Sequence, residues 1–246
     1  MDAFPLHRSG SGSEISRRRL LHRAGMAGLA VAAVNACSTE PVAAAASPPS
    51  SSVVLCRKAW GAASARPGGT PHTLNRMAVH HTEVLLGNNA NAPARLRQHQ
   101  RYHQESQGWI DIAYHLSVDR NGNIYQLRDP NLVGDTATNY DPTGHFLVVC
   151  EGDFDQEGVT AAQLDGAALA FAWAAQQFGI PTDTLAGHRD ESPETTCPGA
   201  SLYAHVTSGD LRSRVDAISA EGPVDLPTIC GPEADAIVAD IEAGIR

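Results

Sequence analysis

Residues 77–82 read Met77-Ala78-Val79-His80-His81-Thr82, a short apolar and β-branched run that predicts a buried strand. Two adjacent histidines stand near its end. Successive side chains of a strand point to opposite faces of a sheet, so only one of these histidines can face a given site. We therefore expect this stretch to supply both a central strand and one functional histidine.

Helix and strand signals alternate in the chain that follows. A helix is expected to open at Asn91-Ala92-Pro93, with Asn91 as N-cap and proline in the first turn, and to end near Ser106. Strands are expected at 110–118 and 123–127, because they flank Asn121-Gly122, a dipeptide that favours a two-residue hairpin turn.

The second half of the chain continues this alternation. A buried strand is expected at 146–150, and Thr160-Ala161-Ala162-Gln163 is a capping box that opens a helix ended by Gly179. Two further helices are expected at 209–220 and 233–244. Strands interleaved with helices predict an α/β fold with a mixed central β-sheet flanked by helices.

Composition limits the classes of function. The chain has 246 residues, a net charge of −9 and Lys58 as its single lysine. Binding of nucleic acid through a basic surface needs clustered Lys and Arg to displace counterions, so no nucleic-acid partner is expected. Five cysteines are an odd number, so at least one of them is expected to do something other than pair within the chain.

The N-terminal segment has the pattern of an export signal, expected to span residues 1–36. Arg17-Arg18-Arg19 precedes a run of small apolar residues at 24–34, which resembles a twin-arginine signal and is too short to span a bilayer with certainty. An amphipathic helix of a cytosolic protein is the alternative. Cys37 either carries a lipid anchor or follows a cleavage site. Export would leave no transmembrane helix in the mature chain.

The remaining chain divides by composition. Residues 37–52 are rich in Ala, Pro and Ser and predict a flexible linker. A folded domain is expected at 53–206, followed by a helical tail at 207–246. Residues 1–36 carry five Arg and two acidic residues, so their removal takes the net charge from −9 to −12.

The candidate chemistry lies in two short motifs. They are Gly187-His188-Arg189-Asp190 and Thr195-Thr196-Cys197-Pro198-Gly199. If the loop between them folds back, His188 and Cys197 can converge on one metal ion, and a histidine from 80–81 would complete the set. A His, His, Cys set with a fourth position left to water is the open geometry of catalytic zinc.

These motifs, with Val79-His80-His81-Thr82 and Trp109-Ile110-Asp111-Ile112-Ala113-Tyr114-His115, occur in the order found in type 2 N-acetylmuramoyl-L-alanine amidases. The chain resembles this family, which includes T7 lysozyme and the catalytic peptidoglycan recognition proteins, over roughly residues 56–206. The resemblance implies the fold of the peptidoglycan recognition proteins. It also implies hydrolysis of the amide between N-acetylmuramic acid and L-alanine, with peptidoglycan as partner.

Roles for individual residues come from the same resemblance. It implies a Zn²⁺ cofactor held by His80, His188 and Cys197, with Tyr114 as the catalytic tyrosine. Thr195 matches the place where relatives carry a Thr or Lys that contacts the reacting carbonyl. Two departures stand out: the spacing from His188 to Cys197 is one residue longer than usual, and Asp135-Thr136-Ala137 stands where relatives often carry a His-Ala pair.

Other readings stay open. The chain is either the enzyme, a catalytically silent peptidoglycan-binding protein of the same fold, or an exported module in which Cys197 forms a disulfide. His99 and His103 share a helix face and either line a groove or hold a metal ion. Three further cysteines leave the disulfide pairing open; one possibility joins Cys56 to Cys230, with Cys150 as a buried thiol.

Overall fold

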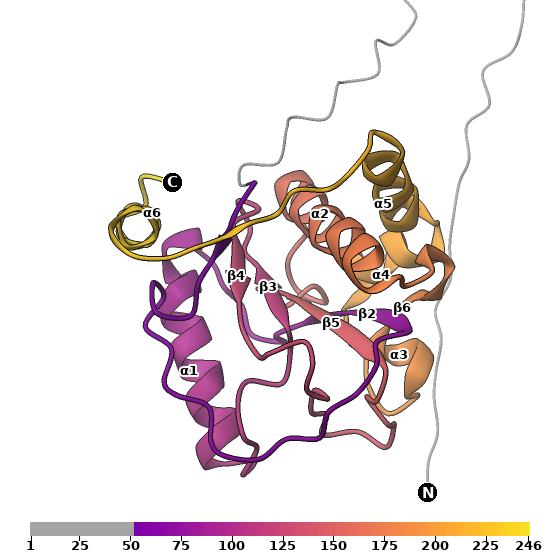
Figure 1. Cartoon of the computed structure of the whole chain (residues 1–246), viewed down its shortest axis with the longest axis horizontal. Coiled ribbons are helices and arrows are strands. Elements are labelled where there is room, and N and C mark those ends of the chain that lie inside the picture. The colour runs from indigo at the N-terminus through magenta and orange to yellow at the C-terminus, as the bar shows by residue number, and fades with distance from the viewer. Residues whose placement is uncertain (1–51) are drawn as a thin grey trace, which may run out of the picture. The chain divides into compact units, whose positions relative to one another are not determined.

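The computed structural model describes residues 52–246, so the expected signal at 1–36 and nearly all of the linker at 37–52 lie outside the described residues. Its centre is a seven-stranded mixed sheet with the order β6-β2-β5-β3-β4-β1-β7 (Figure 1). The strands are β1 (Val54–Leu55), β2 (Arg76–His81), β3 (Leu116–Val118), β4 (Ile124–Gln126), β5 (His145–Cys150), β6 (Leu185–Gly187) and β7 (Thr228–Ile229). The predicted fold class is confirmed.

Helices cover both faces of this sheet. They are α1 (Ala92–Glu105), α2 (Ala161–Phe178), α3 (His188–Glu191), α4 (Ala200–Thr207), α5 (Asp210–Ala220) and α6 (Pro232–Glu242), with 3-10 turns η1 (Asn89–Asn91) and η2 (Thr182–Thr184). In Figure 1, α1 and α6 lie to the left of the sheet, and α2, α4 and α5 lie above it. The molecule is therefore built in three layers.

The edge strand β6 and its neighbours β2, β5 and β3 run parallel to one another. In β2 and β5 the side chains on both faces are buried, which explains why the sequence shows continuous apolar runs there rather than strict alternation. Val79 pairs with Val148 and His80 with Val149. Val148 packs toward α2, whereas Val149 packs toward α1. His80 therefore lies on the α1 face of the sheet.

Two regions of the sequence fold differently from the prediction. The strand expected at 110–118 is confined to β3, because the carbonyls of Asp111 and Ile112 accept hydrogen bonds from the Arg128 guanidinium instead of a neighbouring strand. The expected two-residue turn is also wrong. The Gly122 N–H donates to the carbonyl of Asp119, and of the two turn residues only Gly122 has a positive φ.

The helix ends follow the sequence closely, with two exceptions in their capping. Thr160 accepts a hydrogen bond from the Gln163 N–H, as a capping box requires, and Gly179 ends α2 at a φ of 67°. The Gln163 side chain does not complete the box but donates to the carbonyls of Val118 and Glu151. Asn91 makes no side-chain capping bond, and its amide donates to the Leu86 carbonyl instead.

The segment after residue 206 packs onto the sheet and its helices. Leu211 and Val215 of α5 enter the core on the α2 face, whereas Val238 and Ile241 of α6 enter the core on the α1 face. β7 pairs in parallel with β1. No helix within residues 52–246 is both long and apolar enough to cross a membrane.

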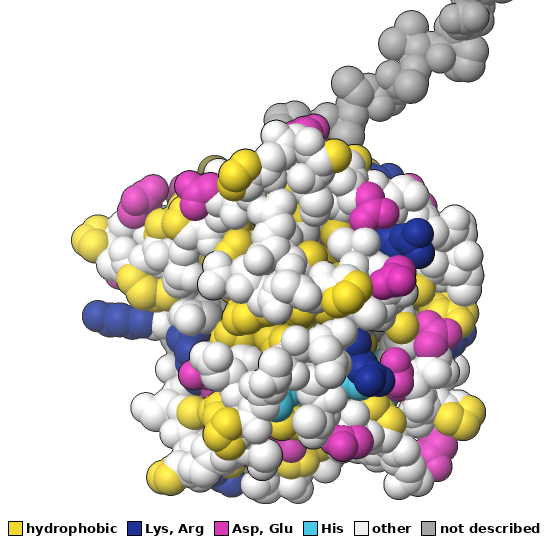
Figure 2. All heavy atoms as spheres, turned by 45° about the vertical axis from the view of Figure 1, so that its right-hand side comes forward, with side chains coloured by type: hydrophobic (Ala, Val, Ile, Leu, Met, Phe, Trp, Pro, Cys, Tyr) yellow, Lys and Arg dark blue, Asp and Glu magenta, His cyan; other side chains and the backbone are white. Residues whose placement is uncertain are grey.

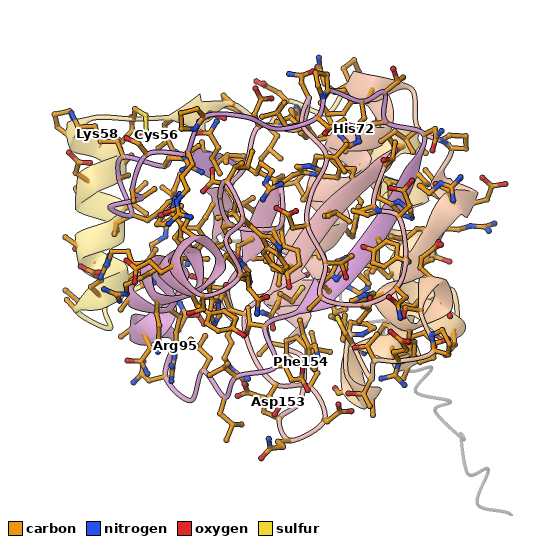
Figure 3. All side chains as sticks on the ribbon, turned by 90° about the horizontal axis from the view of Figure 1, so that it is seen from below. Cys56, Lys58, His72, Arg95, Asp153 and Phe154 are labelled. Atoms are coloured by element: carbon orange, nitrogen blue, oxygen red, sulfur yellow. A yellow bond between two sulfur atoms is a disulfide. The ribbon has the colours of Figure 1, made fainter. Side chains whose placement is uncertain are left out.

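A disulfide joins the two ends of the folded region. Cys56 lies directly after β1 and bonds to Cys230, directly after β7, across 174 positions of sequence. Figure 3 places Cys56 beside α6. Cys150 is a fully buried free thiol in β5. The pairing left open by the sequence is thus Cys56 with Cys230.

Candidate metal centre

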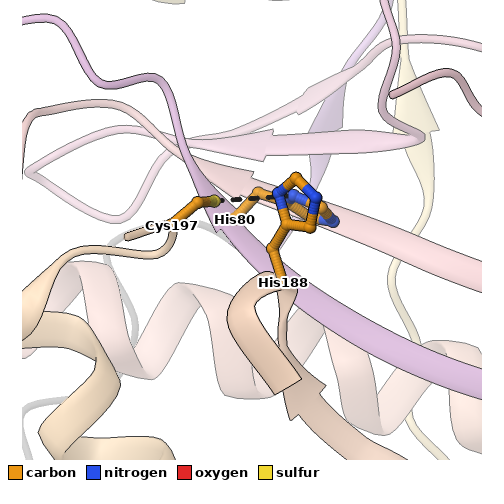
Figure 4. A group of neighbouring side chains, drawn as sticks. All are labelled: His80, His188 and Cys197. Atoms are coloured by element: carbon orange, nitrogen blue, oxygen red, sulfur yellow. Dashed lines mark hydrogen bonds between the residues drawn. The ribbon is translucent and has the colours of Figure 1, made fainter. Parts of the chain in front are cut away.

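Three side chains from three separate parts of the chain meet at one edge of the sheet (Figure 4). His80 lies near the carboxyl end of β2, His188 begins α3 directly after β6, and Cys197 lies in the loop before α4. All three are buried, and their ligand atoms lie within 4.8 Å of one another. Because β2 and β6 are parallel neighbours, with Val79 paired to Gly187, their carboxyl ends place the two histidines side by side.

Strand alternation separates the two adjacent histidines of β2. The Nδ1 of His80 lies 3.6 Å from the Sγ of Cys197. The His81 ring instead stacks on Phe154 and accepts a hydrogen bond at Nδ1 from the Phe154 N–H. The expectation that only one of the pair faces the site agrees with the structure, and that residue is His80.

The Cys197 loop is held from several directions. The Cys197 N–H donates to the Thr195 hydroxyl, the Cys197 carbonyl accepts from the Arg189 N–H, and the His81 N–H donates to Sγ. The Thr196 hydroxyl donates to Asp155, which also accepts from the first N–H of α4. The thiol is therefore fixed in direction before any ligand arrives.

The dimensions and protonation of this group suit a metal ion. Tetrahedral zinc, with bonds of about 2.3 Å to sulfur and 2.05 Å to nitrogen, holds those two atoms about 3.6 Å apart. That distance equals the one between Cys197 Sγ and His80 Nδ1. Burial lowers the pKa of His80 well below its usual range and that of His188 to about 4, so both imidazoles are neutral and able to ligate. Burial raises the pKa of the Cys197 thiol to about 12, which a bound cation would reverse.

The three side chains open onto a cleft of about 180 Å³. Tyr114 and Thr195 line it, so the structure places both sequence-predicted catalytic residues beside the candidate ligands. The Tyr114 ring centroid lies 5.1 Å from that of His80, and burial raises the pKa of its hydroxyl well above the usual range. Tyr114 therefore carries its proton at neutral pH and can donate it in a hydrogen bond to a group in the cleft.

His99 and His103 of α1 both line the groove beside the candidate metal centre. The Nδ1 of His103 accepts a hydrogen bond from the Ala113 N–H, and its side chain borders the same cleft. His99 borders an adjoining cavity of about 320 Å³. Among residues 52–246, the one group of His, Cys, Asp and Glu side chains spaced for a metal ion is His80, His188 and Cys197.

Two hydroxyls beside His188 escaped sequence reasoning. Thr138 Oγ1 lies 2.8 Å from His188 Nε2, and Thr136 Oγ1 lies 2.9 Å from Thr138 Oγ1. Both residues sit in the loop between β4 and β5. The sequence shows that residues 135–137 differ from the His-Ala pair of relatives. Its spacing does not show that this loop contacts His188, 50 positions after Thr138.

Charge is distributed rather than concentrated over the face seen in Figure 2. Acidic side chains, shown in magenta, lie among apolar and basic ones, and histidine side chains, shown in cyan, are visible within hollows of the surface. This face therefore shows acidic and basic side chains interspersed rather than a broad patch of one charge.

Comparison with known proteins decides the family. The family model described as N-acetylmuramoyl-L-alanine amidase matches residues 70–200, more than half of the chain. This chain belongs to that family. The matched range contains all three candidate metal ligands as well as Tyr114 and Thr195.

Curated relatives within this family include recognition proteins and named amidases. Peptidoglycan-recognition protein SC2 of Drosophila melanogaster is 28% identical over 159 residues, which cover 62% of this chain and 84% of the relative. The N-acetylmuramoyl-L-alanine amidase of Homo sapiens is 34% identical over 155 residues, which cover 60% of this chain and 26% of the human protein. The likeness therefore spans about a quarter of the human protein.

Solved structures show the same fold. Wild-type Drosophila peptidoglycan recognition protein LB aligns with a TM-score of 0.56 and 28% identity, covering 63% of this chain and 92% of that one. Peptidoglycan recognition protein LE, solved in complex with tracheal cytotoxin, aligns with a TM-score of 0.58 and 29% identity, covering 64% and 94%. The peptidoglycan recognition protein fold is thus shown for this member of the family.

Proposed function

We propose that this protein is a zinc-dependent N-acetylmuramoyl-L-alanine amidase, which hydrolyses the amide between N-acetylmuramic acid and L-alanine of peptidoglycan. The observation that carries the proposal is the set of His80, His188 and Cys197 at the base of a cleft lined by Tyr114 and Thr195. Three protein ligands leave the fourth tetrahedral position for water or substrate, the arrangement of catalytic zinc sites.

Each residue has a distinct role in this proposal. The two histidines and the Cys197 thiolate hold zinc, which supplies Lewis-acid polarisation of water and of the scissile carbonyl when bound. Tyr114 donates a hydrogen bond to the oxygen that gains negative charge as the amide carbon becomes tetrahedral. The Thr195 hydroxyl accepts from the Cys197 N–H, which leaves its own proton free to donate toward the same oxygen.

The substrate assignment rests on the family and on a ligand seen in a relative. Peptidoglycan recognition protein LE was solved with monomeric diaminopimelic acid-type peptidoglycan. The matched domain of this chain carries its cleft on the same fold, so we assign muramyl peptides as its ligands. The acidic net charge of −9 leaves their recognition to the cleft rather than to attraction of anionic wall polymers.

Release of stem peptides from purified peptidoglycan by the zinc-loaded protein tests this function. We expect Tyr114→Phe to lower turnover about 100-fold or more, because it removes one donor to the developing oxyanion. Tyr203→Phe is the matched control, since Tyr203 is outside the cleft and its hydroxyl donates to Asp190. We expect Cys197→Ala to abolish both zinc binding and turnover.

The alternative is a catalytically silent peptidoglycan-binding protein of the same fold. If wild type and Tyr114→Phe bind muramyl peptides equally and release no stem peptide from several wall chemistries, the amidase proposal fails and this alternative stands. Loss of the cysteine ligand is the usual mark of the silent state, and this chain keeps Cys197, whose Sγ lies 3.6 Å from His80 Nδ1.

The proposal includes export by the twin-arginine route, with a signal at 1–36 and a linker at 37–52 ahead of the domain. The disulfide between Cys56 and Cys230 supports an oxidising compartment, because such bonds rarely persist in the cytosol. Mass spectrometry of the mature N-terminus tests it. Cleavage near residue 36 is expected, a lipid on Cys37 would identify a lipoprotein, and an intact residue 1 would contradict export.

A further inference from the structure

The loop between β4 and β5 contacts His188 of the candidate metal centre. Thr138 Oγ1 lies 2.8 Å from the Nε2 of His188, which places it within normal hydrogen-bond distance. Thr136 Oγ1 lies 3.4 Å from the same nitrogen. The other ring nitrogen of His188 is Nδ1. The centroid of the His188 ring lies 4.7 Å from the centroid of the His80 ring.

The two threonines are held by each other and by the backbone. Thr136 Oγ1 lies 2.9 Å from Thr138 Oγ1 and accepts a hydrogen bond from the Thr138 N–H. The next residue, Asn139, donates from its backbone and its side chain to the two oxygens of Glu194. Glu194 belongs to the loop that carries Cys197, so the position of Thr138 is fixed relative to two of the three candidate ligands.

A neutral imidazole has one protonated nitrogen, and a metal ion binds the other one. Metal-ligating histidines nearly always donate their remaining N–H to a fixed acceptor, which sets the tautomer and the direction of the ring. A threonine hydroxyl can accept such a bond while its own proton turns toward a second acceptor. Here that second acceptor is Thr136 Oγ1.

We propose that Thr138, oriented by Thr136, is the positioning residue that fixes His188 as an Nδ1 ligand of the metal ion. This inference rests on the metal centre of the proposed function and adds the chain of hydroxyls behind it. Where relatives often carry a His-Ala pair, this chain has Asp135-Thr136-Ala137, and the Thr136 hydroxyl contacts the hydroxyl of Thr138. In this chain the segment at 135–137 therefore supplies a threonine hydroxyl that supports the contact between Thr138 and His188.

The dissociation constant of zinc from the full chain, measured by competition with a chromogenic chelator, tests the inference without an activity assay. We expect Thr138→Val to raise that constant about 10- to 100-fold, the usual effect of losing a hydrogen bond to a ligating histidine. Thr138→Ser keeps the hydroxyl and should restore binding to near the wild-type value. Thr184→Val is the matched control, because Thr184 is half-buried and its hydroxyl donates to the Pro181 carbonyl.

A spectroscopic measurement examines the tautomer directly. Long-range ¹H–¹⁵N spectra of the zinc-loaded wild type should show His188 with its proton on Nε2 and the metal on Nδ1, with faster exchange of that proton in Thr138→Val. Zinc bound through Nε2, a wild type that binds no zinc, or equal zinc affinity of Thr138→Val and Thr184→Val would overturn the proposal. A protein that binds zinc as described yet releases no stem peptide would refute the amidase function and leave this inference intact.

Discussion

The buried carboxyl group of Glu151, which lies near His99 of α1, allows a direct test of how burial shifts pKa values in this fold. Glu151 directly follows β5, is 1% exposed and accepts a hydrogen bond from the Ser117 hydroxyl at Oε1. Its other oxygen, Oε2, has no hydrogen-bond partner among the described residues, and the nearest histidine nitrogen, in His99, lies 3.9 Å away. Burial raises the pKa of Glu151 from 4.5 to about 8 and lowers that of His99 to about 4, so both groups are neutral near pH 6.

The sign of the effect on stability follows from proton binding. Between pH 4.5 and 8 the folded state holds a proton on Glu151 that the unfolded state has released, so the free energy of unfolding falls as the pH rises through this window. Linkage between the two pKa values gives a loss of about 3 kcal/mol between about pH 5.5 and pH 8. Glu151→Gln cannot ionise and has nearly the shape of the protonated acid, so it removes this loss.

Urea unfolding of zinc-saturated wild type and Glu151→Gln across this pH range measures the effect. We expect the wild type to lose about 3 kcal/mol relative to the variant, which makes the variant the more stable protein at the alkaline end. Glu105→Gln, at an exposed position of α1, is the matched control and should follow the wild type. A difference between wild type and Glu151→Gln that does not change with pH would refute the reasoning.

Three other predictions concern the frame of the site. Removing the Cys56–Cys230 bond by a double serine substitution should cost up to about 5 kcal/mol in urea unfolding, because it closes a loop of 174 positions; a loss below about 1 kcal/mol would contradict this. Gly199→Ala should lower the free energy of unfolding by more than about 2 kcal/mol, because the added Cβ would lie 2.7 Å from the backbone of Phe154. Gly209→Ala, where φ is also positive but the space is open, should lower it by about 1 kcal/mol. Equal losses in the two variants would contradict this prediction. Calorimetry of zinc binding in several buffers at about pH 6 should show about one proton released per zinc ion. That proton comes from Cys197, because both histidine ligands are already neutral. Release of two or more protons would contradict the lowered pKa values of the histidines.

Local geometry explains which features of the site could be predicted from sequence. His80 and His81 face opposite sides of the sheet because side chains alternate along a strand. This difference can be predicted without knowledge of the rest of the fold. The helix end at Gly179 is equally local, because the left-handed conformation there favours glycine. The approach of His188 and Cys197 to His80 was accessible through the order of motifs in a known family, and not through spacing alone.

The features that sequence reasoning missed depend on contacts between distant segments. Residues 110–115 alternate like a strand, but the Arg128 guanidinium binds the carbonyls of Asp111 and Ile112, and β3 begins only at Leu116. The turn after β3 shifts because the Asp119 carboxylate accepts from the N–H groups of Asn121 and Asn123. The contact of Thr138 with His188 likewise joins residues 50 positions apart in the sequence, and no local pattern encodes it.

The four cysteines within residues 52–246 differ in state because they lie at different places on the sheet. Cys56 and Cys230 lie at the opposite end of the sheet order from His80 and His188, where β1 and β7 meet, and they pair there. Cys150 packs into the apolar core on the α2 face, whereas Cys197 faces His80 on the α1 face, so the sheet stands between the two free thiols. Burial also raises the pKa of Cys150 and of Cys197, and a neutral thiol reacts poorly with disulfides. An oxidising compartment can therefore close the structural bridge while Cys197 remains a thiol that becomes a thiolate only when a metal ion binds.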